Sequence, residues 1–295
     1  MAEPLPISIL RALRPKQWTK NAVVLAPFVF ALGDAAQPVK FGHVWLAAAA
    51  AATFCLVSSG IYVLNDIKDA PLDRAHPQKR HRPIAAGAIS PRQGMVLSGL
   101  CLITGLSLGY SLQTDLGYTL LAYVALQTAY IFGLKHIALL DLLMIASGFV
   151  LRAIAGAVAI PVMLSPWLLV CTFLLALFLA LCKRRQEKVG QAGATDTRPS
   201  LLHYDRVVLD QLIAVIASAT LVSYTIYTLA AETQEKFGSA RLGFTIPFVV
   251  FGLFRYLDLV YRAEKGERPE EVLLTDPPLL LCVALFGATV LLLLL

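Results

Sequence analysis

The chain carries HVWLAAAAAATFCLVSSGIYVL at residues 43–64, and this apolar stretch runs directly into NDIKDAPLD at residues 65–73. As a helix, the apolar stretch is long enough to cross the hydrocarbon core of a bilayer, which is about 30 Å thick. The aspartates at 66, 69 and 73 are spaced by three and four residues, so they share one face of a helix. Pro71 lies inside this run and has no amide hydrogen. It predicts that the helix kinks or breaks there and that an irregular turn completes the acidic face.

Carboxylates at a membrane boundary are costly unless water, a cation or a metal ion compensates their charge. The basic run Lys79-Arg80-His81-Arg82 follows closely behind them. Mg²⁺ binds one or two carboxylates and completes its shell with water and substrate phosphates, so an acidic face beside a basic loop fits a magnesium–diphosphate substrate. We therefore predict that Asp66, Asp69 and Asp73 are catalytic and that, together with Asn65, they are the magnesium ligands. The alternative is a solvated helix end whose acids pair with nearby Lys and Arg side chains.

The composition is typical of a membrane protein. Of the 295 residues, 58% are hydrophobic and 15% charged, and the mean hydropathy is +0.70. A soluble domain carries about a quarter of charged residues. The five cysteines lie in or beside apolar segments without CxxC spacing, which favours core side chains over disulfides or zinc ligands. The net charge of +6 comes from basic residues in short loops between spans, which argues against a nucleic-acid partner.

The hydropathy pattern predicts nine membrane-spanning helices. They are expected at residues 21–35, 43–64, 92–112, 116–134, 138–160, a sixth ending near 182, 207–231, 242–262 and 275–295. Residues 1–20 are predicted to form an interfacial segment, and residues 65–92 and 183–205 to form long polar loops at the active site. The fold class is therefore an all-α polytopic membrane protein with one domain over residues 1–295, its helices surrounding a central cavity open to the cytoplasmic side.

The distribution of basic residues predicts the orientation of the chain. With the N-terminus on one side, the loops facing that side hold 20 of the 25 Lys and Arg residues. The positive-inside rule then places the N-terminus and the long polar loops in the cytoplasm, at the inner (plasma) membrane. An odd number of spans places the C-terminus on the far side.

Further candidates for substrate binding lie at the same predicted mouth. Lys183, Arg184 and Glu187 end the sixth span, and if the helix continues, Lys183 and Glu187 face the same way. A plain cytoplasmic anchor is the alternative for this group. Seven further cations are candidates, of which several must be ordinary membrane anchors: Arg14, Lys16, Lys20, Lys79, Arg80, Arg82 and Lys135. Those predicted to bind substrate are Lys20, Lys79, Arg80, Arg82 and Lys135.

Two single residues complete the set of candidates. Tyr130 closes the fourth span, either as a substrate contact or as an aromatic-belt anchor. Arg152 lies well inside the fifth span, where an interior carboxylate or phosphate is the expected partner. Asp141 lies about three turns earlier on the same predicted helix, which is too far for the two residues to pair directly.

Several of these stretches resemble known families. The pattern Asn65-Asp66-x-x-Asp69-x-x-x-Asp73 resembles the first aspartate-rich motif of the UbiA superfamily of intramembrane prenyltransferases, and residues 130–135 (YIFGLK) are similar to its fourth helix. Four stretches are similar to the decaprenyl-phosphate phosphoribosyltransferase branch: RPKQWTKN at 14–21, DRAHPQKRHRPIAAG at 73–87, FGLKH at 132–136 and RAIAG at 152–156. This resemblance spans nearly the whole chain. It adds Asn21 to the expected substrate-binding residues.

The resemblance implies a reaction. Most members of the superfamily carry a second acidic motif where this chain has KRRQE at 183–187, and cations there suit a substrate with an additional phosphate. The implied reaction transfers 5-phosphoribose from phosphoribosyl pyrophosphate (PRPP) to a polyprenyl phosphate in a lipid bilayer, with Mg²⁺ as cofactor and pyrophosphate as leaving group. Such a lipid product serves the synthesis of cell-envelope glycan precursors.

The resemblance also implies roles for the candidates. Lys183 and Arg184 are expected at the 5-phosphate and Glu187 at the ribose hydroxyls. Lys20, Lys135 or the basic loop at residues 79–82 is expected at the lipid phosphate. Two alternatives stay open. One is transfer of a polyprenyl group from its diphosphate to an aromatic acceptor. The other is a transporter or channel, whose charges would be expected along the spans rather than gathered at one mouth.

Overall fold

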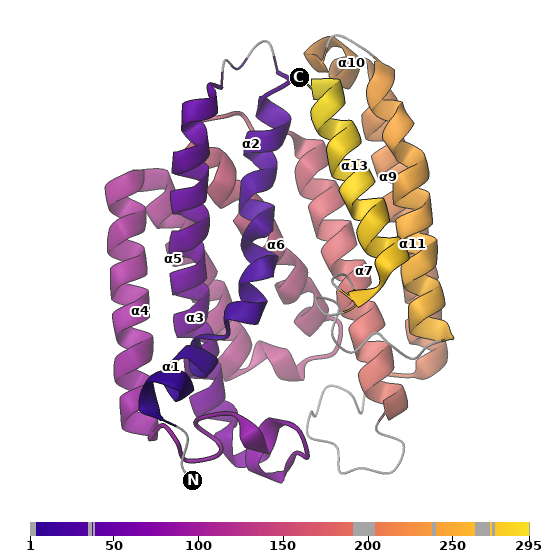
Figure 1. The fold of residues 1–295 in the computed structure, drawn as a ribbon. Helices are drawn as coiled ribbons and strands as arrows, with labels where there is room; N and C mark the ends of the chain where they lie inside the picture. The colour runs from indigo at the N-terminus through magenta and orange to yellow at the C-terminus, as the bar shows by residue number, and fades with distance from the viewer. Residues whose placement is uncertain are drawn as a thin grey trace.

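Every regular element in the described part of the chain is a helix. The computed structural model describes residues 4–34, 37, 39–190, 204–237, 240–262, 272 and 275–294. The elements are α1 (Leu5–Leu13), η1 (Pro15–Leu25), α2 (Ala26–Ala31), η2 (Phe41–His43), α3 (Val44–Ala75), η3 (Lys79–His81), α4 (Pro91–Leu112), α5 (Thr114–Phe132), η4 (Leu134–His136), α6 (Leu140–Ala159), α7 (Pro166–Gly190), α9 (Arg206–Leu229), α10 (Ala231–Phe237), η5 (Ala240–Thr245), α11 (Ile246–Tyr261) and α13 (Pro277–Leu294). Here η marks 3₁₀ helices. The long helices run side by side along one axis, with α1 at one end and α10 at the other (Figure 1).

The sequence of α3 explains its central place. Six consecutive alanines at 47–52 favour a helix. Side chains spaced by three or four residues are buried along one face: Ala47, Ala50, Phe54, Val57 and Ile61. This face packs against α4 and α5, and the neighbouring α6 also contacts α3. The start of α4 is defined by a capping box, in which Ser90 and Gln93 each bond the backbone amide of the other.

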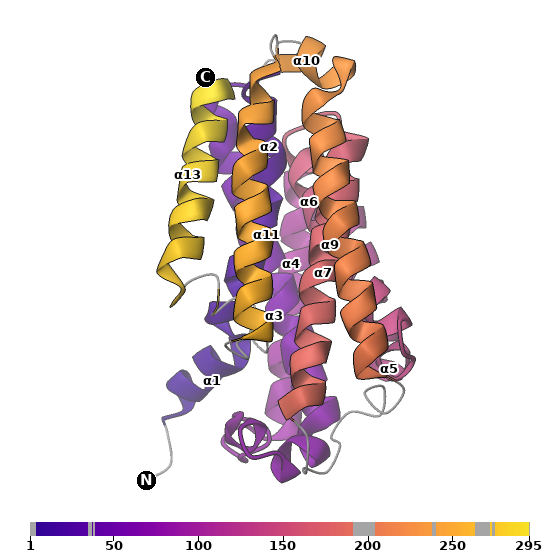
Figure 2. The same cartoon turned by 90° about the vertical axis from the view of Figure 1, so that its right-hand side faces the viewer.

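Successive helices pack against one another, from α3 through α4, α5, α6 and α7 to α9, with α11 and α13 following. Figure 2 shows α13 beside α11, with α10 at one end and α1 at the other. The first and last parts of the chain meet at the end opposite to α1. A Cβ added to Gly33, just after α2, would lie 2.6 Å from the Leu294 side chain of α13. Nearby, Lys236 of α10 forms an ion pair with Asp34 at 2.9 Å. These contacts join the N-terminal and C-terminal parts of the chain.

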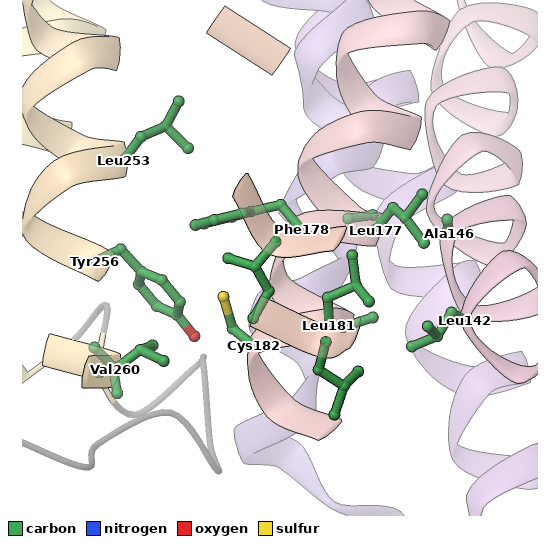
Figure 3. Packing of buried hydrophobic residues seen from close by; sticks show 14 of the residues in the cluster. Leu142, Ala146, Leu177, Phe178, Leu181, Cys182, Leu253, Tyr256 and Val260 are labelled. Atoms are coloured by element: carbon green, nitrogen blue, oxygen red, sulfur yellow. The ribbon is translucent and has the colours of Figure 1, made fainter. Parts of the chain in front are cut away.

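A large apolar cluster joins α6, α7 and α11. Figure 3 shows its side chains from these three helices, which include Leu142, Ala146, Leu177, Phe178, Leu181, Cys182, Leu253, Tyr256 and Val260. The rings of Phe178 and Tyr256 meet edge to face at 5.6 Å between centroids. Cys182 is fully buried there, and all five cysteines are free thiols. Cys101, Cys182 and Cys282 are buried, as expected of packing residues, whereas Cys55 and Cys171 are half-buried.

The predicted break at Pro71 is wrong. Helix α3 continues to Ala75 with Pro71 inside it, so residues 65–75 of the predicted 65–92 loop are helical. Two contacts beyond the proline hold this last turn: Arg82 bonds Asp73 at 2.7 Å, and Arg74 donates to the carbonyl oxygen of Ala85 at 3.2 Å. These bonds to the following segment compensate for the hydrogen bond that the proline cannot donate.

Two predicted boundaries also need correction. The first predicted span, 21–35, is the second half of the 3₁₀ segment η1 followed by the six-residue helix α2. The sixth span does not end near 182, because α7 continues to Gly190. Of the second predicted loop, residues 183–190 are thus helical and residues 191–203 lie outside the described residues.

Seven described helices are long and apolar enough to cross a membrane: α3, α4, α6, α7, α9, the combined η5–α11 segment and α13. Helix α5 packs between α4 and α6 without being among these seven. The count of nine spans and the central cavity stay predictions.

The crossing of η1 and α6 leaves no room for a side chain at Gly156. A Cβ there would collide with the carbonyl group of Val24, whose carbon atom would lie 2.8 Å away. Because the obstacle is backbone, we expect Gly156→Ala to lower the stability by about 1–3 kcal/mol, as overpacking does. The measurement is thermal unfolding of the purified protein in one detergent.

Gly99→Ala is the matched control, since a Cβ at Gly99 of α4 meets nothing within 4 Å. Alanine is the better helix former, so this change should be neutral or stabilising by about 0.5–1 kcal/mol. Equal unfolding temperatures for the two variants would contradict the close approach of η1 to α6.

Candidate active site

Three carboxylates lie on one face at the end of α3. Asp66 is 2% exposed and Asp73 is 4% exposed, whereas the Asp69 side chain keeps 23% of its surface accessible. Because α3 is continuous, the spacing of three and four residues places all three on one side. Asp66 and Asp73 both accept a hydrogen bond from the same atom, Nη1 of Arg82, at 3.1 and 2.7 Å. The two carboxylates therefore converge on a single point.

Two further cations complete the charge balance of this acidic face. Arg14 forms an ion pair with Asp66, on the same oxygen atom that Arg82 contacts. Lys135 forms an ion pair with Asp69 at 2.5 Å and is itself buried. We call Asp66, Asp69 and Asp73 with these three cations the acidic cluster.

The local backbone explains how Arg14 reaches this place. Arg14 lies between α1 and η1 with φ 54° and ψ 60°, a left-handed conformation that turns the chain sharply. Ser59 of α3 forms hydrogen bonds with residues on both sides of this turn. Its hydroxyl group donates to the carbonyl oxygen of Leu13 at 2.8 Å and accepts from the indole nitrogen of Trp18 at 3.0 Å. The N-terminal segment is thus held against α3 one to two turns before Asp66.

The donor set of the acidic cluster fits Mg²⁺. Asp66, Asp69, Asp73 and Asn65 offer only oxygen atoms as ligands, which this ion prefers. Asp66 and Asp73 already share one cationic nitrogen, so they accommodate a positive charge between them. Among the described residues no three His, Cys, Asp or Glu side chains form a preformed metal site.

A second charged cluster lies where α7 passes the start of α6. Arg184 is 1% exposed and Asp141 is fully buried, and they form an ion pair at 2.9 Å. Arg184 also pairs with Glu187 at 2.5 Å. The hydroxyl group of Tyr204 donates to Asp141 at 2.6 Å and accepts from the Leu139 amide at 2.7 Å. Burial, and then the hydrogen bond to Asp141, raise the pKa of Tyr204 above its ordinary value, so this phenol stays a donor at neutral pH. We call Asp141, Arg184, Glu187 and Tyr204 the buried arginine cluster.

One short segment connects the two clusters. Lys135 in η4 reaches Asp69 of the acidic cluster, and Asp141, six residues later at the start of α6, reaches Arg184. The connection between α5 and α6 thus contributes a residue to each cluster. Tyr130 lies near the end of α5, just before this connection.

Arg152 lies deeper, surrounded by neutral groups. Its guanidinium donates to the side-chain oxygen of Asn21 at 2.8 Å, to the carbonyl oxygen of Gly148 at 2.8 Å and to the hydroxyl of Tyr123 at 3.0 Å. Its central carbon lies 5.0 Å from the ring centroids of Phe54, Tyr123 and Phe149. Within the described residues no carboxylate pairs with it, so the expected interior carboxylate is not found. The prediction that Asp141 does not pair with Arg152 is confirmed, since Asp141 bonds Arg184.

The predicted site residues separate into three groups. The acidic cluster holds Asp66, Asp69, Asp73, Arg82 and Lys135. Arg184 and Glu187 lie in the buried arginine cluster, while Asn21 and Arg152 bond each other deeper in the bundle. Arg80 is exposed and bonds the neighbouring His81 at 3.3 Å. Substrate contacts of Lys20, Asn65, Lys79, Tyr130 and Lys183 stay predictions.

Sequence reasoning missed Asp141, Tyr204 and Tyr123 as parts of these clusters. Asp141 carried a usable signal, because a carboxylate inside an apolar helix implies a partner. It was considered only as a partner for Arg152 on its own helix. Tyr204 follows a polar stretch and lies 63 residues from Asp141 in sequence, so no local pattern connects the two.

Comparison with known proteins shows the family of the chain. The model of the UbiA prenyltransferase family matches residues 24–272. The chain belongs to this family. Relatives named decaprenyl-phosphate phosphoribosyltransferase include one from Mycolicibacterium smegmatis, 35% identical over 91% of this chain and 86% of the relative. Another, from Corynebacterium glutamicum, is 35% identical over 91% of this chain and 81% of the relative.

Solved structures of UbiA proteins share the fold. A UbiA homolog from Archaeoglobus fulgidus, bound to DMAPP and Mg²⁺, superposes with a TM-score of 0.73 at 18% identity, covering 97% of this chain and 99% of the other. The predicted all-α fold and family are thereby confirmed. Together with its apolar helices, membership of the UbiA family makes the protein a multi-pass membrane protein.

Proposed function

We propose that this UbiA protein is a phosphoribosyltransferase that moves 5-phosphoribose from PRPP to a polyprenyl phosphate and releases pyrophosphate. The relatives at 35% identity over most of the chain carry the name of that activity. The observation that carries the proposal is the presence of two separate charged clusters connected by one segment, the acidic cluster and the buried arginine cluster. PRPP likewise has two anionic ends, a diphosphate and a 5-phosphate, separated by a ribose.

The acidic cluster is proposed to bind the diphosphate end. Asp66, Asp69 and Asp73 would hold Mg²⁺, with Asn65 as a possible neutral ligand. Bound there, this ion would neutralise the diphosphate and favour its departure from the ribose. Arg82 and Lys135 already lie on these carboxylates, within reach of phosphate oxygens bound at the same place. Guanidinium groups bind phosphate through two parallel hydrogen bonds, which orients the group as well as attracting it.

The buried arginine cluster is proposed to bind the ribose 5-phosphate end. Arg184 is held by carboxylates on two helices, so its guanidinium has one defined orientation. The Glu187 side chain keeps 15% of its surface accessible and can accept hydrogen bonds from ribose hydroxyls. Lys183 supplies a further positive charge at the same turn. Tyr130, near the end of α5, is proposed to complete this half of the site.

In the proposed reaction the bond between ribose C1 and the diphosphate oxygen breaks, and an oxygen of the lipid phosphate forms a new bond to C1. The acceptor is an anion, so no strong general base is required. Positive charge develops on the ribose while negative charge moves to the leaving group, and fixed cations close to the leaving group stabilise this transition state. Lys20, Lys79 and Arg80 are proposed to attract the lipid phosphate, whose tail would lie among the apolar helices.

The proposal includes the orientation of the chain in the membrane. The acidic cluster lies at the predicted side whose loops hold most of the basic residues, and the positive-inside rule places that side in the cytoplasm. We place the protein in the inner (plasma) membrane, with this end accessible to a water-soluble donor such as PRPP.

The test compares two donors in parallel. Purified protein in detergent is incubated with Mg²⁺, PRPP labelled in the ribose and a polyprenyl phosphate, or with a labelled polyprenyl diphosphate and an aromatic acceptor. We expect label in the organic phase only in the first reaction, and we expect it to disappear with EDTA. Transfer in the second reaction alone would identify the protein as a prenyltransferase and contradict the proposal.

A further inference from the structure

Each carboxylate of the acidic cluster is paired with at least one of the protein's own cations. Asp66 holds Arg14 and Arg82, Asp73 holds Arg82, and Asp69 holds Lys135. Within the described part of the chain, at least three positive charges thus face these three negative charges. A Mg²⁺ ion that binds without a diphosphate meets carboxylates that are already paired with cations. The electrostatic attraction between Mg²⁺ and this group of carboxylates is therefore largely cancelled.

Separating the two arginines from their carboxylates costs free energy. Asp66 and Asp73 are almost completely buried, and the side chains of Arg14 and Arg82 are only 23% and 26% exposed. A guanidinium displaced from its carboxylate in such a place remains partly desolvated and needs another acceptor. Water alone compensates poorly there, so binding of Mg²⁺ by itself carries a penalty.

A diphosphate removes that penalty. Its oxygens are the acceptors that guanidinium groups bind best, in the same planar, two-bond geometry as a carboxylate. Arg14 and Arg82 approach Asp66 from different segments, one before η1 and one after η3, and meet at a single oxygen atom. Both can turn from the carboxylate to a diphosphate at the same point while the carboxylates turn to the metal ion.

We propose that Arg14 and Arg82 are exchangeable counter-ions of Asp66 and Asp73, and that this exchange makes metal binding depend on the diphosphate. Mg²⁺ and the diphosphate then bind cooperatively, and each is bound weakly without the other. Arg14 thereby becomes a diphosphate-binding residue. The inference deepens the proposed function, because it assigns the acidic cluster to a diphosphate ligand, but it does not depend on ribose being attached.

The first experiment needs no variant. Full-length protein in detergent is titrated with Mg²⁺ by calorimetry, with and without inorganic pyrophosphate, and the heat of the same titration without protein is subtracted. We expect pyrophosphate to increase the affinity for Mg²⁺ by about 5–150-fold, the usual size of a coupling between two sites. Mg²⁺ must increase the affinity for pyrophosphate by the same factor. Equal affinities for Mg²⁺ in both titrations would overturn the proposal.

The second experiment uses Arg14→Gln and Arg82→Gln, with Arg92→Gln as the matched control. Arg92 is an exposed arginine in the first turn of α4. Removing a counter-ion should strengthen binding of Mg²⁺ alone and weaken binding of pyrophosphate, so the coupling falls in the variants and is unchanged in the control. General damage to the fold weakens both ligands, so two changes in the same direction would count against the exchange.

Because pyrophosphate contains no ribose, its binding tests the exchange independently of the identity of the donor. Coupling between Mg²⁺ and pyrophosphate in a protein that transfers nothing from PRPP would support the exchange and contradict the proposed donor. Transfer from PRPP without such coupling would support the function and contradict the exchange.

Discussion

Asp66→Asn and Asp69→Asn should each lower the rate of phosphoribosyl transfer by about 1,000-fold or more, which corresponds to about 4 kcal/mol of transition-state stabilisation. Each change keeps the shape of the side chain but removes the negative charge that would hold the Mg²⁺ ion of the bound metal–diphosphate complex. It also removes the carboxylate paired with Arg14 at Asp66, or with Lys135 at Asp69, whereas Arg82 keeps its ion pair with Asp73. The measurement is the initial rate of lipid labelling from PRPP at saturating Mg²⁺.

Asp115→Asn provides the control for this pair, since Asp115 is an exposed acid in the first turn of α5. Its rate should match that of the unmodified protein. Elution as one folded species in size-exclusion chromatography checks that each variant is intact. A folded Asp66→Asn or Asp69→Asn protein with normal turnover would contradict the assignment of the acidic cluster.

Asp141→Asn should destabilise the protein by about 1.5–3 kcal/mol, because it removes one of the two carboxylates paired with buried Arg184 and leaves Glu187 as the remaining one. It should also raise the KM for PRPP, since Arg184 loses the contact that orients it. Tyr204 loses the carboxylate that accepts its hydrogen bond. Thermal unfolding in detergent and steady-state kinetics measure the two effects.

Asp258→Asn is a matched comparison, because Asp258 also pairs with arginines but keeps 35% of its side-chain surface accessible. Accessible ion pairs contribute about 0–1 kcal/mol, so this variant should unfold nearly as the unmodified protein does. If Asp141→Asn were as stable as Asp258→Asn and bound PRPP normally, Asp141 would have no positioning role.

Much of the acidic cluster was predictable from the sequence. The three aspartates lie next to one another on α3 with helical spacing, so a local pattern carries the information. Pro71 misled the prediction of the helix end, because local preference was overridden by bonds from Arg82 and Arg74 to the last turn of α3. Such tertiary contacts have no signature in the residues around the proline.

The buried arginine cluster shows more clearly what could not be predicted from the sequence. Arg184 and Glu187 are three residues apart and were candidates from the sequence, whereas Asp141 and Tyr204 come from other segments, 43 and 63 residues apart from their partners. The partners of Arg152 could not be predicted from the sequence either. Its partners are neutral oxygens of Asn21, Tyr123 and Gly148, and only the packing of η1 and α5 on α6 brings these groups together.

The most direct test of the central claim follows each phosphate of PRPP separately. The protein is incubated with Mg²⁺, a polyprenyl phosphate and PRPP that is radiolabelled either in the 5-phosphate or in the diphosphate. We predict that the 5-phosphate label moves into the lipid while an equal amount of diphosphate label appears in water as pyrophosphate, and that EDTA stops both. Diphosphate label in the lipid, or no transfer of either label by folded protein, would contradict the account.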